Sequence, residues 1–308
     1  MQALTIAVCT LNRPVDLERC VRSVVAAESP DDLAAVEMLV IDDGHLPEAE
    51  LRKLEQLVSG KGRVFTYLRN AAQHGLIHGR MTAIRNAISD VLLFLDDDVE
   101  IDPDYLRLLV KWYREHPETV GLGGVDTLTR MLPPVRRLLA RLFFQDSGHP
   151  GRLSPSGFSG SMARWGSHRE PFRTEFLSGC NMSFRREALR AVRHLPWLDG
   201  YSLGEDLYLS LVAAGHGPLW VDPGLRVRHH RSSASRMTDS FVSHSTVVNI
   251  YHLLQVRKAP RGSYVALAWT AVGLILKDAV RPSRWRLLPG YLMGLRMIVR
   301  DLLRVRAL

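Results

Sequence analysis

The sequence VLLFLDDD, residues 91–98, joins five consecutive apolar residues to three consecutive aspartates. An apolar run of this length, bounded by polar residues, is typical of a strand buried on both faces of a parallel sheet. The runs LTIAVCT at 4–10 and MLVI at 38–41 have the same form, and Asp42-Asp43-Gly44 follows the second of them. In such sheets ligands bind beyond the carboxyl ends of the strands, so the polar residues at these ends indicate a binding site.

Segments with helical spacing separate these runs. Strands that alternate with helices predict an α/β fold with a doubly wound, mainly parallel mixed sheet and helices on both faces. Residues 127–175, rich in Arg, Pro, Gly and Ser, predict a long excursion that covers the cleft. The remaining expected elements are strands at 64–68, 119–125, 219–221 and 226–228, and helices from Pro14, at 47–58, 76–89 and 104–115, near Arg186, and at 205–214.

The composition excludes several classes of protein. Disorder, a collagen-like repeat and a heptad rod do not fit a chain of 308 residues that is 46% hydrophobic and 23% charged. The cysteines Cys9, Cys20 and Cys180 are too few and too scattered for a disulfide framework or a structural zinc site, and they favour a reduced, cytosolic setting. The chain runs from Met1 into an apolar strand with no basic segment, so no secretory signal is expected.

The basic charge is concentrated near the C-terminus. The net charge is +8, yet residues 255–308 carry eleven Lys or Arg against two Asp, and the rest of the chain carries 29 basic against 30 acidic side chains. The high pI therefore says little about the ligand of the main domain. No aromatic and basic platform accompanies the arginines, so no nucleic-acid partner is expected.

The aspartates 96–98 are the strongest local signal of chemistry. Three adjacent carboxylates on a tight turn repel one another, and a hard divalent cation with oxygen ligands relieves that repulsion. A solvated turn or the first turn of a helix is the alternative, because aspartate is favoured at helix caps.

Four ordered motifs carry a resemblance to a known family. VCTLNRP at 8–14, VIDDG at 40–44, FLDDD at 94–98 and GEDLYLSLVAAGH at 204–216 resemble the family 2 glycosyltransferases of the GT-A fold, over about residues 4–232. The resemblance implies inverting transfer of a sugar from a nucleotide-diphosphate donor to a hydroxyl acceptor, with Mn²⁺ or Mg²⁺. It also implies a catalytic domain at 1–240, with a nucleotide-sugar half at about 1–125 and an acceptor half at about 126–240.

The resemblance further implies roles for residues at the strand ends. Asp42 would pair with the nucleobase, Arg80 would reach the base or the diphosphate, and Asp98 would coordinate the cation, which neutralises charge as the diphosphate leaves. The implied donor-binding residues are Thr10, Asn12, Asp42, Asp43, Asn70, Arg80, Asp96 and Asp97, and the implied metal-binding residues are Asp96, Asp98 and His229, the last from a Pro223-x(5)-His pattern.

Glu205-Asp206 resembles the family's ED motif, whose aspartate is a general base. An acceptor hydroxyl must lose its proton as it attacks the anomeric carbon from the face opposite the diphosphate. Asp206 is the expected base, and Glu205 would contact acceptor or donor hydroxyls beside it. The alternative is that both acids only cap the helix that they begin.

Further residues are expected around the sugar and the phosphates. Gly179 and Asn181 form a Gly-x-Asn-like segment near sugar and acceptor, and Trp197 would stack on a sugar ring, with packing in the core or at the surface as the alternative. Arg231 and Arg236, in the Ser-rich segment RSSASR, would close on phosphates, with a solvated loop as the alternative.

The segment 241–308 is expected to be a basic, helical extension. Residues 262–276 are uncharged but short for a membrane span. An apolar stripe flanked by arginines predicts a helix lying on an anionic membrane surface, and thus a peripheral location on the inner face of the cell membrane with a lipid-linked or cell-surface glycan as acceptor. Packing on the catalytic domain and a homo-oligomer interface are the alternatives. The stripe consists of Leu288, Leu292, Leu295, Val299 and Leu302, and its flanking residues are Arg296, Arg300 and Arg304.

Two other classes of function compete with a glycosyltransferase. A sugar nucleotidyltransferase would carry a Gly-rich basic loop after the first strand, which TLNRP at 10–14 lacks. A non-catalytic nucleotide-sugar-binding scaffold would keep the fold without the base, which the presence of Glu205-Asp206 disfavours.

Overall fold

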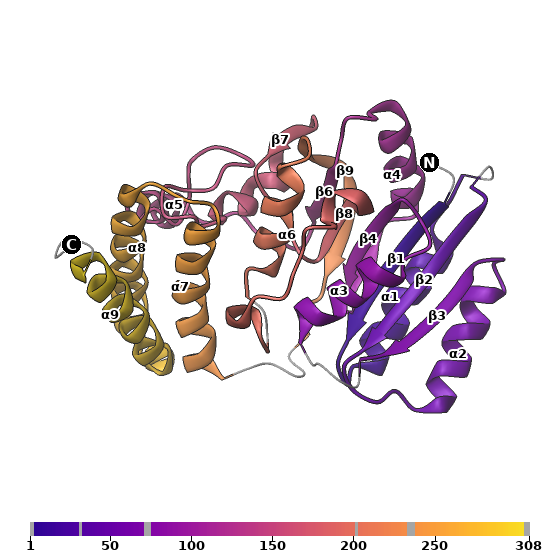
Figure 1. Ribbon diagram of the computed structural model, residues 1–308, viewed down its shortest axis with the longest axis horizontal. Coiled ribbons are helices and arrows are strands. Elements are labelled where there is room, and N and C mark those ends of the chain that lie inside the picture. Colours follow the sequence, from indigo (N-terminus) through magenta and orange to yellow (C-terminus); the bar gives the residue numbers. More distant parts are fainter. Residues whose placement is uncertain (1–2, 31–32, 71–74, 201–202, 233–237, 305–308) are drawn as a thin grey trace. The chain divides into compact units, whose positions relative to one another are not determined.

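The computed structural model describes residues 3–30, 33–70, 75–200, 203–232 and 238–304 (Figure 1). Contacts divide the chain into two compact units, Met1–Arg130 with Trp165–Ser235, and Met131–Arg164 with Arg236–Leu308. In this division residues 131–164 group with the C-terminal helices, and the catalytic domain expected at 1–240 stays a prediction.

The first unit is built on one nine-stranded sheet. Its order is β3-β2-β1-β4-β8-β6-β9-β5, and β7 pairs with β9 outside this path. β3, β2, β1 and β4 are parallel, β8 runs antiparallel to β4 and β6, and β6 and β9 are parallel. The expected mixed, mainly parallel sheet is confirmed. The strands are β1 (Ala3–Thr10), β2 (Ala35–Asp42), β3 (Val64–Arg69), β4 (Val91–Asp96), β5 (Val99–Ile101), β6 (Gly121–Asp126), β7 (Phe172–Thr174), β8 (Asn181–Arg185) and β9 (Leu219–His229).

Helices cover both faces of the sheet, which explains why its central strands are continuously apolar. Ile6 and Val8 of β1 lie in one core cluster with residues of α1 (Pro14–Ala26), α2 (Glu48–Ser59) and α4 (Tyr105–Glu115). On the opposite face, α3 (Leu76–Asn86) packs so closely that a Cβ atom on Gly79 would lie 2.9 Å from Cys9 Sγ.

The expected helices and strands are present with small shifts of their ends, except at three places. The two short strands expected at 219–221 and 226–228 are one strand, β9, with an irregular register opposite Gly123 and Val125. The helix expected near Arg186 is one 3₁₀ turn, Arg186–Leu189. The excursion at 127–175 contains helix α5 (Pro134–Leu142), the 3₁₀ segment Gly160–Ser167 and β7.

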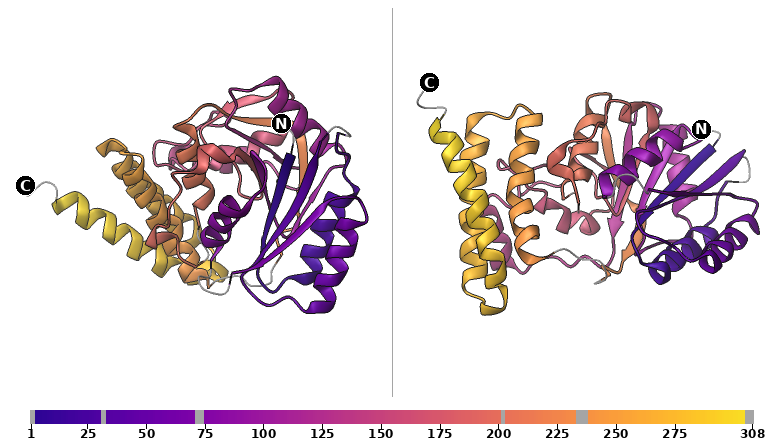
Figure 2. Two further views of the ribbon diagram at one scale, coloured as in Figure 1. Left: turned by 45° about the vertical axis from the view of Figure 1, so that its right-hand side comes forward. Right: turned by 60° about the horizontal axis from the view of Figure 1, so that its bottom comes forward.

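The second unit is helical. Helices α7 (Asp239–Val256), α8 (Arg261–Ala279) and α9 (Leu288–Arg304) follow one another, and Figure 2 shows α9, in yellow, running beside the orange helices. α9 approaches α7 through small residues, since a Cβ on Gly290 would lie 2.2 Å from Ser243 Oγ and one on Gly294 would lie 2.9 Å from Val247 Cγ1. In the parts of the chain that the structure describes, no helix is both long and apolar enough to cross a membrane.

Candidate active site

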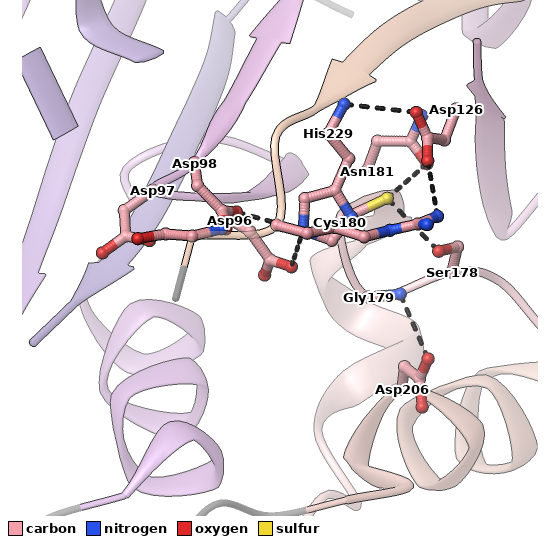
Figure 3. Close-up of polar contacts among 12 residues, drawn as sticks. Asp96, Asp97, Asp98, Asp126, Ser178, Gly179, Cys180, Asn181, Asp206 and His229 are labelled. Atoms are coloured by element: carbon pink, nitrogen blue, oxygen red, sulfur yellow. Dashed lines mark hydrogen bonds and ion pairs between the residues drawn. The ribbon is translucent and has the colours of Figure 1, made fainter. Parts of the chain in front are cut away.

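The aspartate triplet lies at the end of β4 and in the turn that leads to β5 (Figure 3). Asp97 is buried against the end of β1: Thr10 Oγ1 donates to Asp97 Oδ2 at 2.8 Å, and Arg13 Nη1 lies 3.1 Å from Asp97 Oδ1. Burial raises the pKa of Asp97 to about 6, although Thr10 and Arg13 oppose the shift. Ionised Asp97 is therefore unfavourable in the folded chain, and a nearby cation would stabilise its charged form.

Asp96 and Asp98 converge with His229. The antiparallel pair β5–β9 sets Val99 opposite His229, which brings the imidazole to the triplet. His229 Nε2 lies 3.1 Å from Asp98 Oδ1 and 3.9 Å from Asp96 Oδ2, and the ligand atoms of all three residues lie within 4.8 Å of one another. Two carboxylates and one imidazole fit a divalent cation such as Mn²⁺.

Hydrogen bonds stabilise the charged forms of this group. Burial alone would raise the pKa of Asp98, but hydrogen bonds from His229 and from the Ser232 N–H, at 2.7 Å, lower it below its ordinary value. Burial alone would lower the pKa of His229, but Asp98 and Cys180 raise it to about 11. Without a cation the site thus holds Asp98 ionised and His229 protonated, so a cation that binds His229 must displace the imidazolium proton.

Arg80, on helix α3, contacts the acidic residues of the site. Its side chain is 2% exposed on α3, with Nη1 2.8 Å from Glu205 Oε1 and Nη2 3.4 Å from Asp96 Oδ1. Nη2 also donates to the Gly179 carbonyl at 3.0 Å. Burial would lower the pKa of Arg80, but the two carboxylates raise it. The guanidinium therefore holds together segments that are about 100 residues apart in the sequence.

The two acids of the ED pair have different surroundings. They begin α6 (Glu205–Ala214) after Gly204, whose φ of 92° lies in the left-handed region that glycine favours. Glu205 is buried against Arg80, whereas Asp206 is partly exposed and accepts hydrogen bonds from the Gly179 N–H at 3.1 Å and the Leu207 N–H at 2.8 Å. Burial raises the pKa of Asp206, with Arg80 opposing.

The segment before β8 lies between these groups. A Cβ on Gly179 would be 3.1 Å from both Arg80 Nη2 and Glu205 Oε1, so only glycine leaves the contacts undisturbed. Asn181 is fully buried, and its Nδ2 is a buried donor without a hydrogen-bond partner among the described residues. A buried amide donor without a partner indicates that a hydrogen-bond acceptor, such as a ligand oxygen, binds there. Trp197 is partly buried and meets the Tyr208 ring edge-on at 6.5 Å.

The ends of β1 and β2 form the other part of the site. Asp42 is fully buried and accepts hydrogen bonds from the Gly44 and Leu46 N–H groups and from Tyr67 Oη, each at 2.8 Å. Asp42 therefore orders the loop that follows β2. Asn12, with a φ of 55°, sets its carboxamide against Gly44.

Asp43 is the more accessible carboxylate of the pair that ends β2. It accepts hydrogen bonds from Asn70 Nδ2 and the Gly75 N–H, both at 2.7 Å. Arg231 lies further along the chain, with Nη2 2.9 Å from Asp126 Oδ2. Arg236 lies outside the described residues.

Two residues near the site were not expected from the sequence. Arg13 belongs to the motif at 8–14, yet its contact with Asp97 could not be derived from spacing. Asp126 accepts hydrogen bonds from the His229 N–H at 3.2 Å and from Arg231. The sequence feature that could have identified Asp126 is its position at the end of β6, which corresponds to the position of Asp96 at the end of β4.

This strand order, with acidic groups gathered at the ends of β2 and β4, defines a GT-A fold. A mannosyltransferase of Pyrobaculum calidifontis, solved in complex with GDP-Man and Mn²⁺, has a similar structure, with a TM-score of 0.59 at 17% identity over 96% of this chain and 86% of that one. The sequence profile described as Glycosyl transferase family 2 matches residues 5–193, and the chain belongs to this family.

Curated relatives are similar over part of their length. Polypeptide N-acetylgalactosaminyltransferase 11 of Xenopus tropicalis is 27% identical over 73% of this chain and 37% of its own length. Glucosyl-dolichyl phosphate glucuronosyltransferase of Haloferax volcanii is 24% identical over 61% of this chain and 54% of its own length. The chain thus spans between about a third and a half of these two relatives.

Proposed function

We propose that the protein is an inverting, metal-dependent glycosyltransferase that moves a hexosyl group from a nucleotide-diphosphate sugar to a hydroxyl acceptor. The observation that carries this proposal is the linkage of a partly exposed carboxylate, Asp206, to the cation-binding group through Gly179 and Arg80. One carboxylate base beside one cation site suits a single displacement, which inverts the anomeric carbon, and no second carboxylate is needed as a nucleophile.

Asp96, Asp98 and His229 would hold Mn²⁺ or Mg²⁺, and the imidazole favours Mn²⁺ of the two. The bound cation would neutralise charge on the departing diphosphate. The residues that we propose for the donor and acceptor sites form three groups. Thr10, Asn12, Asp42, Asp43, Asn70, Arg80, Asp96 and Asp97 serve the nucleoside and diphosphate, Gly179, Asn181 and Trp197 the sugar and acceptor, and Arg231 and Arg236 the phosphates.

The structure favours different tasks within the first group. Asp43 is the carboxylate accessible to the nucleobase of the donor, while the buried Asp42 orders the loop that follows β2. Arg80 acts on the donor through Asp96, because its own guanidinium is buried among protein groups. These assignments refine the roles that the family resemblance implies.

Asp206 performs the proton transfer in this proposal. As the acceptor oxygen bonds to the anomeric carbon, the bond from that carbon to the diphosphate oxygen breaks and its electron pair leaves with the diphosphate. The hydroxyl proton passes to a carboxylate oxygen of Asp206. The Gly179 N–H orients this carboxylate, and Glu205 keeps Arg80 in place beneath it.

We further propose that residues 262–308 bind the inner face of the cell membrane and that the acceptor is lipid-linked or part of a cell-surface glycan. In α9 the buried residues include Gly290, Tyr291, Gly294 and Ile298, whereas Leu292 and Val299 of the leucine stripe are 53% and 41% exposed. These two members of the stripe are therefore available to a membrane, and the other three are partly buried. The named substrate of the Haloferax volcanii relative is also lipid-linked.

The test is a panel of nucleotide-sugars incubated with the full chain and Mn²⁺ or Mg²⁺, with release of nucleoside diphosphate as the readout. We expect release from one donor class, and at least a 100-fold loss in Asp206→Asn with donor binding kept. Asp104→Asn, at the start of α4 and away from the site, is the matched control and should keep full activity. Undiminished turnover in Asp206→Asn would exclude this base, and donor binding without turnover in the unsubstituted chain would favour the scaffold.

A further inference from the structure

Helix α5 (Pro134–Leu142) presents its apolar side to solvent. Val135, Leu138 and Leu142 are 69%, 68% and 55% exposed, and Leu139 is 46% exposed. These residues share one side of the helix, while the one buried residue, Ala140, lies on the other. A helix of a soluble domain normally turns its apolar side inward, so this orientation calls for a partner.

The C-terminal end of α5 contacts α8, which belongs to the same compact unit (Figure 1). Trp269 stacks on Phe143 at 5.1 Å between ring centroids, and its Nε1 donates to the Leu142 carbonyl at 2.9 Å. Along α8, Val265 and Leu276 are 59% and 54% exposed on the same side as Trp269. The exposed apolar residues of two helices from distant parts of the sequence thus adjoin at Leu142 and Trp269.

The charge around this surface has one sign. The second unit carries 17 Lys or Arg against four Asp, whereas the first carries 23 against 28 Asp or Glu. Arg136 and Arg141 are exposed on α5, and Arg261 and Lys277 are exposed on α8. A second copy of the same face would bring like charges together, whereas anionic lipid headgroups complement them.

We infer that α5, together with the outward side of α8, inserts into the interface of an anionic lipid bilayer. The proposed lipid-binding surface consists of Val135, Leu138, Leu139, Leu142, Val265, Trp269 and Leu276. Apolar side chains enter the acyl boundary, Trp269 takes the interfacial depth that tryptophan prefers, and the arginines contact the headgroups. This surface adds residues 131–144 to the membrane contact proposed for residues 262–308. It rests on that part of the proposed function and is independent of the transfer chemistry.

The experiment measures binding of the full chain to sedimenting vesicles, made either of phosphatidylcholine alone or with 30% phosphatidylglycerol. The test variant is Leu138→Ser with Leu142→Ser. Since both leucines are already exposed, the change should not disturb folding. We expect the double variant to bind the anionic vesicles about 25-fold more weakly, about fivefold for each leucine. Ile88→Ser, at a 57% exposed residue of the first unit, is the matched control and should bind as the unsubstituted chain does.

A second variant tests the charge. Arg136→Gln should weaken binding to the anionic vesicles about fivefold and leave the weak binding to phosphatidylcholine unchanged. Equal binding of the leucine double variant and the unsubstituted chain would overturn the inference. So would a dimer of the unsubstituted chain, in sedimentation without lipid, that the double variant breaks. Release of nucleoside diphosphate in solution should be the same in all these variants, so failure of the transferase proposal would be seen separately.

Discussion

Replacement of Arg80 by Met should leave a first unit whose stability depends strongly on pH through Glu205. The Arg80 guanidinium is buried, and it lies 2.8 Å from Glu205. Burial raises the pKa of Glu205 to about 8 although Arg80 opposes the shift; without Arg80 the pKa rises further, and Glu205 is buried in its protonated form. From an ordinary pKa of 4.5, that protonation costs about 3 kcal/mol at pH 7 and about 1 kcal/mol at pH 5. The lower figure is a small part of the stability of a typical domain, and the higher one a large part.

The sign follows from linkage. In Arg80→Met the folded-state pKa of Glu205 lies above its unfolded value, so stability is greatest below pH 4.5 and is lost as the pH rises towards the folded pKa. Adding Glu205→Gln removes the titrating group. The double variant should therefore be more stable than Arg80→Met by about 3 kcal/mol at pH 7 and by about 1 kcal/mol at pH 5, because its own stability does not depend on the titration of this group.

The assay is urea unfolding at pH 5, 6 and 7, combined with hydrogen exchange of peptides from β4 and α6, because a chain of two compact units need not unfold in one step. Arg52→Met serves as control, since Arg52 is 65% exposed and pairs with Glu48 on the surface; its cost should stay below about 0.5 kcal/mol at every pH. An advantage of the double variant over Arg80→Met that is the same at pH 5 and pH 7, or the lack of any advantage, would refute this account of the buried pair.

Three further outcomes are expected. The transfer rate of the unsubstituted chain should fall as the pH is lowered, with a midpoint above pH 3.8, because activity needs ionised Asp206 and burial raises the pKa of that residue. Initial rates measured between pH 4.5 and 9 check this. A midpoint at the ordinary aspartate pKa of 3.8 would contradict it. His229→Gln should weaken Mn²⁺ binding at least about tenfold in calorimetry, and an unchanged affinity would remove His229 from the cation site. Asp97→Asn should be more stable than the unsubstituted chain by up to about 3 kcal/mol at pH 7.5 without dications, and the difference should vanish near pH 4. The reason is that Asp97 has a raised pKa of about 6 in the folded chain, so the unsubstituted chain loses stability as the pH rises to 6. Thermal unfolding of both chains at pH 4 and pH 7.5 checks this.

Apolar runs predicted the parallel strands well, because strands buried on both faces need residues such as those at 91–95 throughout. β8 was not expected as a strand, although it lies in the middle of the sheet. Its buried Ser183 is polar, and it is accommodated only by long-range partners: it donates to the Leu122 carbonyl at 2.7 Å and meets Tyr113 Oη at 3.1 Å. No local pattern of hydrophobicity carries that information.

The candidate site divides in the same way. Strand ends and motif order predicted which residues would gather, and Asp96, Asp98 and His229 do converge. The contact of Arg80 with Glu205 could not be predicted, because it depends on how α3 and α6 approach the segment before β8. In α9 the apolar stripe was evident from spacing, but the packing face made by Gly290 and Gly294 was not, since small residues leave no hydrophobic pattern.

The place of β8 between β4 and β6 has a consequence for synthesis of the chain. When β4 leaves the ribosome, β1 can pair with one of its edges, but the partner of the other edge lies about 85 residues downstream. Until then an apolar strand has an open row of peptide groups, which is the type of edge that recruits other nascent chains or a chaperone. For the same reason a fragment ending near residue 125 would lack the strand that seals its sheet, and a shortened expression product should extend at least through β9.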